Sequence, residues 1–504
     1  MVNGTSLKEV HSLIQKVNPT YNIFNKITPL NQLLKQQTST NKPVIRYALK
    51  DNITSSELPT TCSSKILMNF QPQYDATVST LLKSQENWVN LGKLNLDEFG
   101  MGSGGVHSSF GAVKNPLYNP VPISVMESIK NDKNVDFEID YSKNRVTGGS
   151  SSGSSALASA IIPGSDIENE RIAHFTLGTD TGGSVRLPAA WCNISSFKPS
   201  YGRISRFGVI PYAQSLDTVG ILSADVDTID MVYEVLDKFD EKDPTSMNET
   251  VRDELKWIDR FDETHDFVSV GIIEEFNISS IPKSTNEVYT QLLSEIIDDK
   301  ANFDLKTVSV DKINESLPIY FTLAPAEASS NLARFDGIRY GPKVENKTDV
   351  NIFENTRNLF GDEVQKRILL GNYNLSSEVY EKKFKKAQIL RTELIDSFNN
   401  CFKDKHPIYN TSSYLNNEDK VDVLISLTAV DKAPLLSDFL NSNSISPLDE
   451  FCNDVFTIPM SLAGLPCISI PIKDSGISIQ ITGQYGYDKK VLGIAKKIKS
   501  KFLD

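Results

Sequence analysis

The strongest constraint on the fold is a short apolar segment that runs directly into a glycine-rich loop and then into a helix. RIAHFTL, residues 171–177, has the apolar content of a buried strand and is followed at once by GTDTGGS, residues 178–184. A second loop, GGSSSGSS at 148–155, leads into the small apolar helix ALASAII. This succession indicates an α/β protein, and α/β sheets place their chemistry at strand ends.

The two loops are suited to stabilising a developing negative charge. Each precedes the start of a helix, where backbone N–H groups without a helical partner point outward. Gly182 and Gly183 allow the backbone to approach a substrate carbonyl closely, and with Thr181 their N–H groups form a candidate oxyanion hole. Ser184, at the end of this loop, is the candidate nucleophile for attack on that carbonyl.

A serine nucleophile needs a base, and histidine is poorly placed to be one in this chain. The five histidines are scattered and none adjoins a glycine-rich loop, as is typical of surface or packing residues. Lys50 is the better candidate, because it follows the apolar segment VIRYAL (44–49) and ends a predicted buried strand. Burial disfavours the ammonium form of lysine, so the side chain can act as a neutral base.

Other interpretations of the serine-rich segments stay open on these patterns alone. GGSSSGSS has the composition of a flexible linker, although linkers do not usually lead straight into an apolar helix. Residues 149–153 also fit GxSxG, which would make Ser151 the nucleophile of an α/β-hydrolase, but the polar stretch before them is a poor core strand. Residues 195–198 fit SxxK without the partner motif KTG, and neither glycine-rich loop continues into a P-loop.

The rest of the chain continues the alternation of strands and helices. Further strands are predicted at 267–272 and 421–427, and helices at 226–239, 378–402 and 489–502. No repeat or low-complexity tail interrupts them, so we predict one α/β domain over 1–504, with a mostly buried sheet covered by helices. The charged, Asn- and Lys-rich segment 119–144 is predicted to be a surface insertion.

Composition excludes several classes of function. The net charge is -12, and a surface of this sign does not hold a nucleic acid by itself, because such binding rests on clustered Lys and Arg. No apolar run reaches the length of about 18 residues that indicates a membrane span. The five cysteines are scattered without a CxxC pair, so neither a disulfide framework nor a zinc site is predicted, and a reducing compartment fits best.

The first 45 residues are poor in acidic side chains and place apolar residues on one face of a predicted helix. These residues are Leu7, Val10, Ile14 and Val17. The pattern partly fits a mitochondrial presequence, although the segment contains no arginine. We therefore expect organelle import, with an ordinary first helix of the domain as the alternative.

Three stretches taken together resemble the amidase signature family. They are ALKDNI (48–53), GGSSSGSSA (148–156) and GTDTGGSVRLPAAWCN (178–193). Ordered similarity extends over about residues 17–500, and it implies a single domain built on a mixed sheet with helices on both faces. The resemblance further implies a relay of Ser184 as nucleophile, Ser150 as a bridging serine held by a cis peptide bond, and Lys50 as base. An acyl-enzyme would release ammonia and then be hydrolysed.

Within the family the chain is most similar to the glutaminase subunits of glutamyl-tRNA(Gln) amidotransferases. The stretches that carry this similarity are 324–341, 362–377 and 448–459. The resemblance implies that Arg367 binds the α-carboxylate of glutamine and Asp454 its α-ammonium, since a guanidinium and a carboxylate complement these charges. It also implies that Tyr320 lines the same pocket.

The resemblance implies a division of labour between subunits. Ammonia released here would pass to a companion B-type subunit, which would use ATP and magnesium to amidate the glutamate misacylated on tRNA(Gln). This chain is then expected to hold no metal or cofactor of its own. Its acidic balance agrees with tRNA(Gln) being contacted mainly through the partner, and a small third subunit is left open.

The chain departs from the family pattern at three places. Ser152 replaces a glycine of the first loop, 163–171 is a polar insertion predicted to be a surface loop, and the N-terminal region 1–40 is shortened. A chain trimmed and extended in this way resembles fungal mitochondrial members, so we predict a mitochondrial localisation, with the cytoplasm as alternative. The alternative function is a free-standing amidase, which would have no use for the amino-acid clamp of Arg367 and Asp454.

Overall fold

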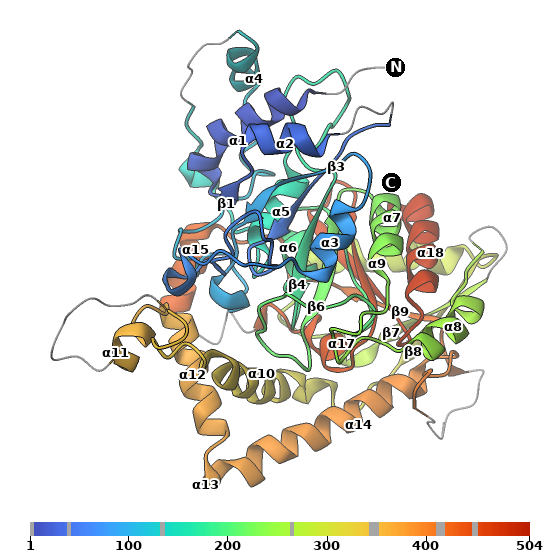
Figure 1. Ribbon diagram of the computed structural model, residues 1–504. Helices are drawn as coiled ribbons and strands as arrows, with labels where there is room; N and C mark the ends of the chain where they lie inside the picture. Colours follow the sequence, from blue (N-terminus) through green and yellow to red (C-terminus); the bar gives the residue numbers. More distant parts are fainter. Residues whose placement is uncertain are drawn as a thin grey trace.

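The computed structural model of the chain describes residues 5–37, 42–131, 137–262, 267–341, 352–409, 419–445 and 452–503. The strands are β1 (Phe24–Ile27), β2 (Ile45–Lys50), β3 (Trp88–Leu94), β4 (Phe175–Asp180), β5 (Ser195–Lys198), β6 (Thr218–Ser223), β7 (Val268–Ile273), β8 (Phe303–Val308), β9 (Val423–Leu427), β10 (Cys467–Ile472) and β11 (Ile477–Gly483). They form one 11-stranded sheet in the order β1-β3-β2-β4-β6-β5-β10-β11-β9-β7-β8 (Figure 1). β2 runs parallel to β3 and β4, and β7 runs parallel to β8 and β9. The other neighbouring pairs are antiparallel, so the sheet is mixed.

Helices surround this sheet. They are α1 (Leu7–Tyr21), α2 (Leu30–Gln36), α3 (Thr77–Lys83), α4 (Ile123–Lys130), α5 (Ser152–Ser159), α6 (Arg186–Trp191), α7 (Val226–Leu236), α8 (Glu249–Ile258), α9 (Lys283–Asp298), α10 (Ser316–Leu332), α11 (Ile352–Arg357), α12 (Asp362–Asn374), α13 (Ser377–Val379), α14 (Lys385–Cys401), α15 (Leu436–Ile445), α17 (Ile458–Leu462) and α18 (Asp488–Ile498). None of the helices in the described ranges is long and apolar enough to cross a lipid bilayer.

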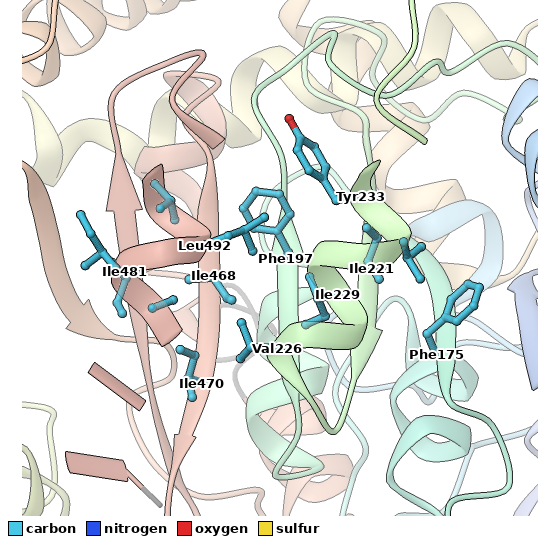
Figure 2. Packing of buried hydrophobic residues seen from close by; sticks show 14 of the residues in the cluster. Phe175, Phe197, Ile221, Val226, Ile229, Tyr233, Ile468, Ile470, Ile481 and Leu492 are labelled. Atoms are coloured by element: carbon cyan, nitrogen blue, oxygen red, sulfur yellow. The ribbon is translucent and has the colours of Figure 1, made fainter. Parts of the chain in front are cut away.

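Both faces of the central strands are buried, and alternate residues of each strand pack against a different set of helices. Phe175 of β4, Ile221 of β6 and Ile468 of β10 point to one face, where Ile229 of α7 and Leu492 of α18 pack against them (Figure 2). Successive side chains of a strand point to opposite faces, so the intervening residues meet a different set of helices.

On that second face α5 and α6 cover the same strands. The Thr176 hydroxyl in β4 donates to the Ser154 carbonyl in α5 at 2.9 Å. Leu222 of β6 is fully buried in a cluster with Val185 and with Ala189 of α6. The predicted α/β fold, a mixed sheet covered by helices on both faces, is therefore confirmed.

Two helix predictions need correction at their ends. The helix predicted over 226–239 stops at Leu236, and Phe239 lies beyond it with 38% of its surface exposed. Asp237 leaves the helical conformation there, and its carboxylate pairs with Arg203 at 2.7 Å and also with Arg252. The helix predicted over 378–402 is found as α13 and α14, joined by a π-helical turn at Tyr380–Phe384.

The predicted first helix is α1, and it is built into the domain. Val10, Leu13 and Val17 are buried in one cluster with Leu91 and Leu94 of β3. A capping box in which Ser6 and Glu9 bond each other's backbone starts this helix. Removal of α1 would expose that apolar cluster to water.

The two predicted insertions behave differently. The expectation of a surface segment at 119–144 is wrong for α4, because Val125 and Met126 are buried in the cluster that contains α1. Residues 132–136 of this insertion lie outside the described residues. The segment 163–171 is largely exposed, but Glu170 is buried and pairs with the Arg46 guanidinium at 2.9 Å.

Candidate active site

The sheet brings the sequence-predicted residues to one edge. β2 and β4 are parallel neighbours, so their carboxyl ends meet. Lys50 is the last residue of β2, and β4 ends directly before the loop that carries Ser184. The first Gly/Ser loop joins them, because the backbone N–H of Ser151 donates to the Ser184 carbonyl at 3.1 Å. Three segments distant in sequence therefore form one site.

Lys50 is fully buried and lies among hydroxyl groups. Its Nζ is 2.8 Å from the Ser150 Oγ, 2.9 Å from the Ser151 Oγ and 2.9 Å from the Thr179 Oγ1. The Thr179 carbonyl lies 3.2 Å away. The peptide bond between Gly149 and Ser150 is cis. The base and the bridging serine of the predicted relay are thus in direct contact.

Burial changes the protonation of Lys50. Removal from water lowers the pKa of Lys50 to about 7, although the carboxylates of Asp97, Asp180 and Asp217 oppose that change. A pKa near 7 leaves about half of the amines neutral at neutral pH. Lys50 can therefore accept a proton, as a general base must.

Ser184 is half-buried, whereas Lys50 and Ser150 are buried. Within the described ranges its hydroxyl makes no hydrogen bond, so the second link of the predicted relay, from Ser184 to Ser150, is not closed in this structure. Hydrogen bonds of catalytic groups are often long before substrate binds. The backbone contact between the two loops keeps both serines in neighbouring segments.

The candidate oxyanion hole has unused donors. In the part of the chain that the structure describes, the N–H groups of Thr181, Gly182 and Gly183 make no hydrogen bond to protein. All three residues are buried. Buried N–H groups are nearly always paired, so this loop is suited to receive an acceptor from a ligand.

A buried ion pair fixes the loop from behind. The Asp180 carboxylate binds the Arg186 guanidinium at 2.9 and 3.0 Å, and neither side chain has exposed surface. Burial would raise the pKa of Asp180, but the charge of Arg186 holds it below its usual value. Arg186 also donates to the Thr457 carbonyl and the Ser461 hydroxyl, which ties the loop to α17.

Two of the three predicted substrate-binding residues, Tyr320 and Asp454, lie against the same loop. A Cβ atom on Gly182 would lie 2.9 Å from Cζ of Tyr320, and one on Gly183 would lie 2.5 Å from Oδ1 of Asp454. These two contacts leave room only for glycine. Arg367 is buried in α12, close enough to Tyr320 to lower the pKa of that phenol, although burial leaves the pKa well above its ordinary value.

A model of the amidase family matches residues 7–121 and 140–492. The chain belongs to the amidase family. The unmatched stretch 122–139 falls inside the predicted insertion, and the resemblance inferred from the motifs is confirmed.

Two similar relatives of this amidase are fungal proteins. It is 42% identical to the Eremothecium gossypii protein named as the mitochondrial A subunit of glutamyl-tRNA(Gln) amidotransferase, over 97% of this chain and 98% of the relative. It is 40% identical to the Candida albicans protein of the same name, over 93% of this chain and 95% of the relative. The predicted mitochondrial localisation agrees with these names.

Solved amidase structures have the same fold. The A subunit of glutamyl-tRNA(Gln) amidotransferase from Thermotoga maritima superposes with a TM-score of 0.71 at 29% identity, covering 98% of this chain and 90% of that chain. An allophanate hydrolase from Kluyveromyces lactis superposes with a TM-score of 0.73 at 21% identity, covering 98% and 69%. The second likeness concerns the fold alone.

Several residues of the amidase site were not predicted from the sequence. Thr179, whose hydroxyl contacts Lys50, stands within the GTDTGGS motif and could have been found there. Tyr212 accepts a hydrogen bond from Arg367 at 2.8 Å, and Glu363 accepts another at 2.7 Å. Glu363 stands four positions before Arg367, the spacing of an ion pair on one helix face, which is a usable signal.

The alternative nucleophile is enclosed. Ser151 has no exposed surface, and its hydroxyl lies between the Lys50 amine at 2.9 Å and the Thr179 carbonyl at 3.3 Å. These neighbours leave no space for a substrate carbonyl. The described residues also contain no group of three or more His, Cys, Asp or Glu side chains that could hold a metal ion.

The depressed pKa of Lys50 predicts how amidase activity depends on pH. Only the neutral amine accepts a proton, so kcat/KM should rise as the pH passes through about 7 and level off about one unit higher. A pH profile of ammonia release measures this, and a profile without an inflection between about pH 6 and about pH 8 would contradict the assignment of Lys50 as base. The folded chain binds fewer protons than the unfolded chain between the two pKa values of Lys50, so this residue's contribution makes stability rise with pH from about 7 to 10.5.

Proposed function

We propose that this chain is the glutaminase subunit of a mitochondrial glutamyl-tRNA(Gln) amidotransferase. The observation that carries the proposal is that Tyr320 and Asp454 lie against the loop of Ser184 and that Arg367 is buried near Tyr320. A guanidinium and a carboxylate that both lie near Tyr320 match the α-carboxylate and α-ammonium of an amino acid. Glutamine and asparagine are the amino acids whose side-chain amides yield ammonia on hydrolysis, and the similarity to proteins named as A subunits of glutamyl-tRNA(Gln) amidotransferases favours glutamine.

In this proposal each residue of the site has one role. Ser184 attacks the amide carbon, and its proton passes through Ser150 to Lys50. The N–H groups of Thr181, Gly182 and Gly183 stabilise the oxyanion. Ammonia leaves with a proton returned along the relay, and water hydrolyses the glutamyl ester by the reverse path.

The proposed products and partners are those that the family resemblance implies. Ammonia would pass to a B-type subunit that converts Glu-tRNA(Gln) to Gln-tRNA(Gln), with ATP and magnesium bound by that partner. Contacts with tRNA(Gln) are proposed to lie mainly on the partner, because this chain has a net charge of -12. A small third subunit is compatible with this assembly.

A free-standing amidase is the second candidate, because the residues around Lys50 would serve any amide. The test compares glutamine with 4-aminobutanamide, which is glutamine without its α-carboxylate, using the chain in complex with its B-type partner. Ammonia release from glutamine is expected, and release from the simple amide alone would favour the free-standing amidase.

Arg367→Lys is expected to raise KM for glutamine by about 10- to 100-fold, because lysine keeps the charge but loses bidentate pairing with a carboxylate. KM for 4-aminobutanamide should stay within about threefold of the wild-type value, since this amide offers no carboxylate. Steady-state kinetics of both substrates measure the effect. Equal changes for the two substrates would show that Arg367 does not read the carboxylate.

A further inference from the structure

Asp217, a buried aspartate that lies outside the GTDTGGS motif, is hydrogen-bonded to the oxyanion loop, residues 181–183. The Thr181 hydroxyl donates to Asp217 Oδ1 at 2.7 Å. Both side chains are buried, with 4% and 5% of their surface exposed. Thr181 supplies the first N–H of the proposed oxyanion hole, so this bond holds the loop where the negative charge would develop.

The other carboxylate oxygen of Asp217 also accepts hydrogen bonds. Its Oδ2 accepts the backbone N–H groups of Tyr212 at 2.9 Å and Ala213 at 3.1 Å. The carboxylate thus joins Thr181 on one side to the backbone of Tyr212 on the other. Because the group is buried, no bulk water stands ready to replace a lost partner.

Tyr212 completes a path to the substrate-binding arginine. Its hydroxyl accepts from Nη1 of Arg367 at 2.8 Å. Glu363 fixes the same guanidinium through Nε at 2.7 Å. Hydrogen bonds and one short stretch of backbone therefore run from Arg367 through Tyr212 and Asp217 to Thr181.

We propose that Asp217 is a positioning residue that couples recognition of the substrate's α-carboxylate at Arg367 to the geometry of the oxyanion loop at Thr181. This inference rests on the proposed function, because it takes glutamine as the substrate. A substrate carboxylate bound to Arg367 orders the guanidinium, and the ordered guanidinium orders the side chain of Tyr212. Asp217, which is hydrogen-bonded to the backbone of Tyr212 and to Thr181, passes this order to the oxyanion loop. An amide without the carboxylate leaves the hydrogen-bonded groups between Arg367 and Thr181 unordered. Discrimination in favour of glutamine is therefore expected in kcat as well as in KM.

The size of the effect follows from the sensitivity of oxyanion holes. Loss of one donor lowers kcat by about 10²- to 10³-fold in enzymes of this kind. A loop that is displaced without losing its donors should cost less, about 10- to 100-fold. The wild-type ratio of kcat for glutamine to kcat for 4-aminobutanamide is therefore expected to be about 10 to 100.

The test removes two side-chain hydroxyls of this hydrogen-bonded path, neither of which contacts the scissile amide. Thr181→Val removes the hydroxyl bound to Asp217 and keeps the volume and the backbone N–H. Tyr212→Phe removes the hydroxyl bound to Arg367 and keeps the ring. Thr218→Val is the matched control, since this buried hydroxyl in β6 donates only to the Leu216 carbonyl at 3.1 Å. All chains are assayed in complex with the B-type partner, after a thermal melt shows that each variant is folded.

The measured quantity is the ratio of the two kcat values, which a merely structural loss would not move. Each single variant is expected to lower the ratio to below about 5, mainly through glutamine, and the double variant to lower it no further. Thr218→Val should leave the ratio unchanged. Equal loss of kcat for both substrates, or multiplicative effects in the double variant, would overturn the coupling. A wild-type complex that does not hydrolyse glutamine would instead overturn the proposed function.

Discussion

Alanine in place of Ser184 is expected to lower kcat for ammonia release from glutamine by at least about 10⁴-fold, the size of loss seen when a nucleophile is removed. Ser150 and Ser151 are bound to the Lys50 amine, so neither hydroxyl is placed to replace Ser184 as the nucleophile. Stability should change by less than about 0.5 kcal/mol, since Ser184 is half-buried and its side chain makes no hydrogen bond within the described ranges. Ammonia assays and denaturant unfolding measure the two effects.

Ser151→Ala is the comparison that separates a nucleophilic Ser184 from the α/β-hydrolase interpretation. Ser151 contacts Lys50 but is closed to substrate, so its removal is expected to lower kcat by only about 10-fold, through the pKa and position of the amine. If Ser184→Ala kept its turnover while Ser151→Ala lost it, the nucleophile would have been assigned to the wrong loop.

Asp180→Ala is expected to destabilise the fold by about 3–5 kcal/mol, because it leaves a buried charge without its partner. Arg186 has no exposed surface, and Asp180 binds it through two oxygens at 2.9 and 3.0 Å. Among the described residues its other hydrogen bonds go to the neutral oxygens of Thr457, Ser461 and Gln480, and Asp454 acts on it only as a charge without a hydrogen bond. The free energy of unfolding in urea measures the loss.

The matched control is an ion pair at the surface. Asp253 pairs with Lys256 at 2.6 Å, but both side chains are about two-thirds exposed or more, at 67% and 72%. Solvent screens such a pair, so Asp253→Ala should change the free energy of unfolding by less than about 0.5 kcal/mol. Similar losses of unfolding free energy in the two variants would show that burial does not increase the contribution of the Asp180–Arg186 pair to stability.

The sequence predicted the order of the elements that carry the site, but β4 runs over Phe175–Asp180 rather than 171–177, so the first three residues of the predicted loop belong to the strand. Lys50 followed the segment VIRYAL, in which Arg46 is the one charged residue, and this pattern predicted a largely buried strand that ends at Lys50. Ser184 and the backbone N–H donors beside it were predictable because residues 178–184 combine glycines with a serine directly before a predicted helix. The family's roles for these residues and for Ser150 remain predictions that the experiments above test.

What the sequence could not supply are contacts between segments far apart in the chain. Asp217 and Thr181 are 36 positions apart, and Tyr212 and Arg367 are 155 apart, so no local pattern relates them. The buried part of the insertion was missed for a similar reason: the segment 119–144 is rich in charged residues, and the apolar cluster that Val125 and Met126 join also contains α1, which is distant in the sequence. The end of α7 depended on the pairing of Asp237 with distant arginines. Residues 448–451, in a stretch that supported the subgroup resemblance, lie outside the described residues.

The central claim is that Ser184 forms a glutamyl ester during the hydrolysis of glutamine. The most direct measurement is a rapid acid quench of the wild-type complex turning over glutamine, followed by proteolysis and mass spectrometry of the peptides that carry Ser150, Ser151 and Ser184. We expect the added mass of one glutamyl group on Ser184 alone, and no modified peptide from Ser184→Ala. A glutamyl group on Ser151, or continued turnover with no modified serine, would contradict the claim.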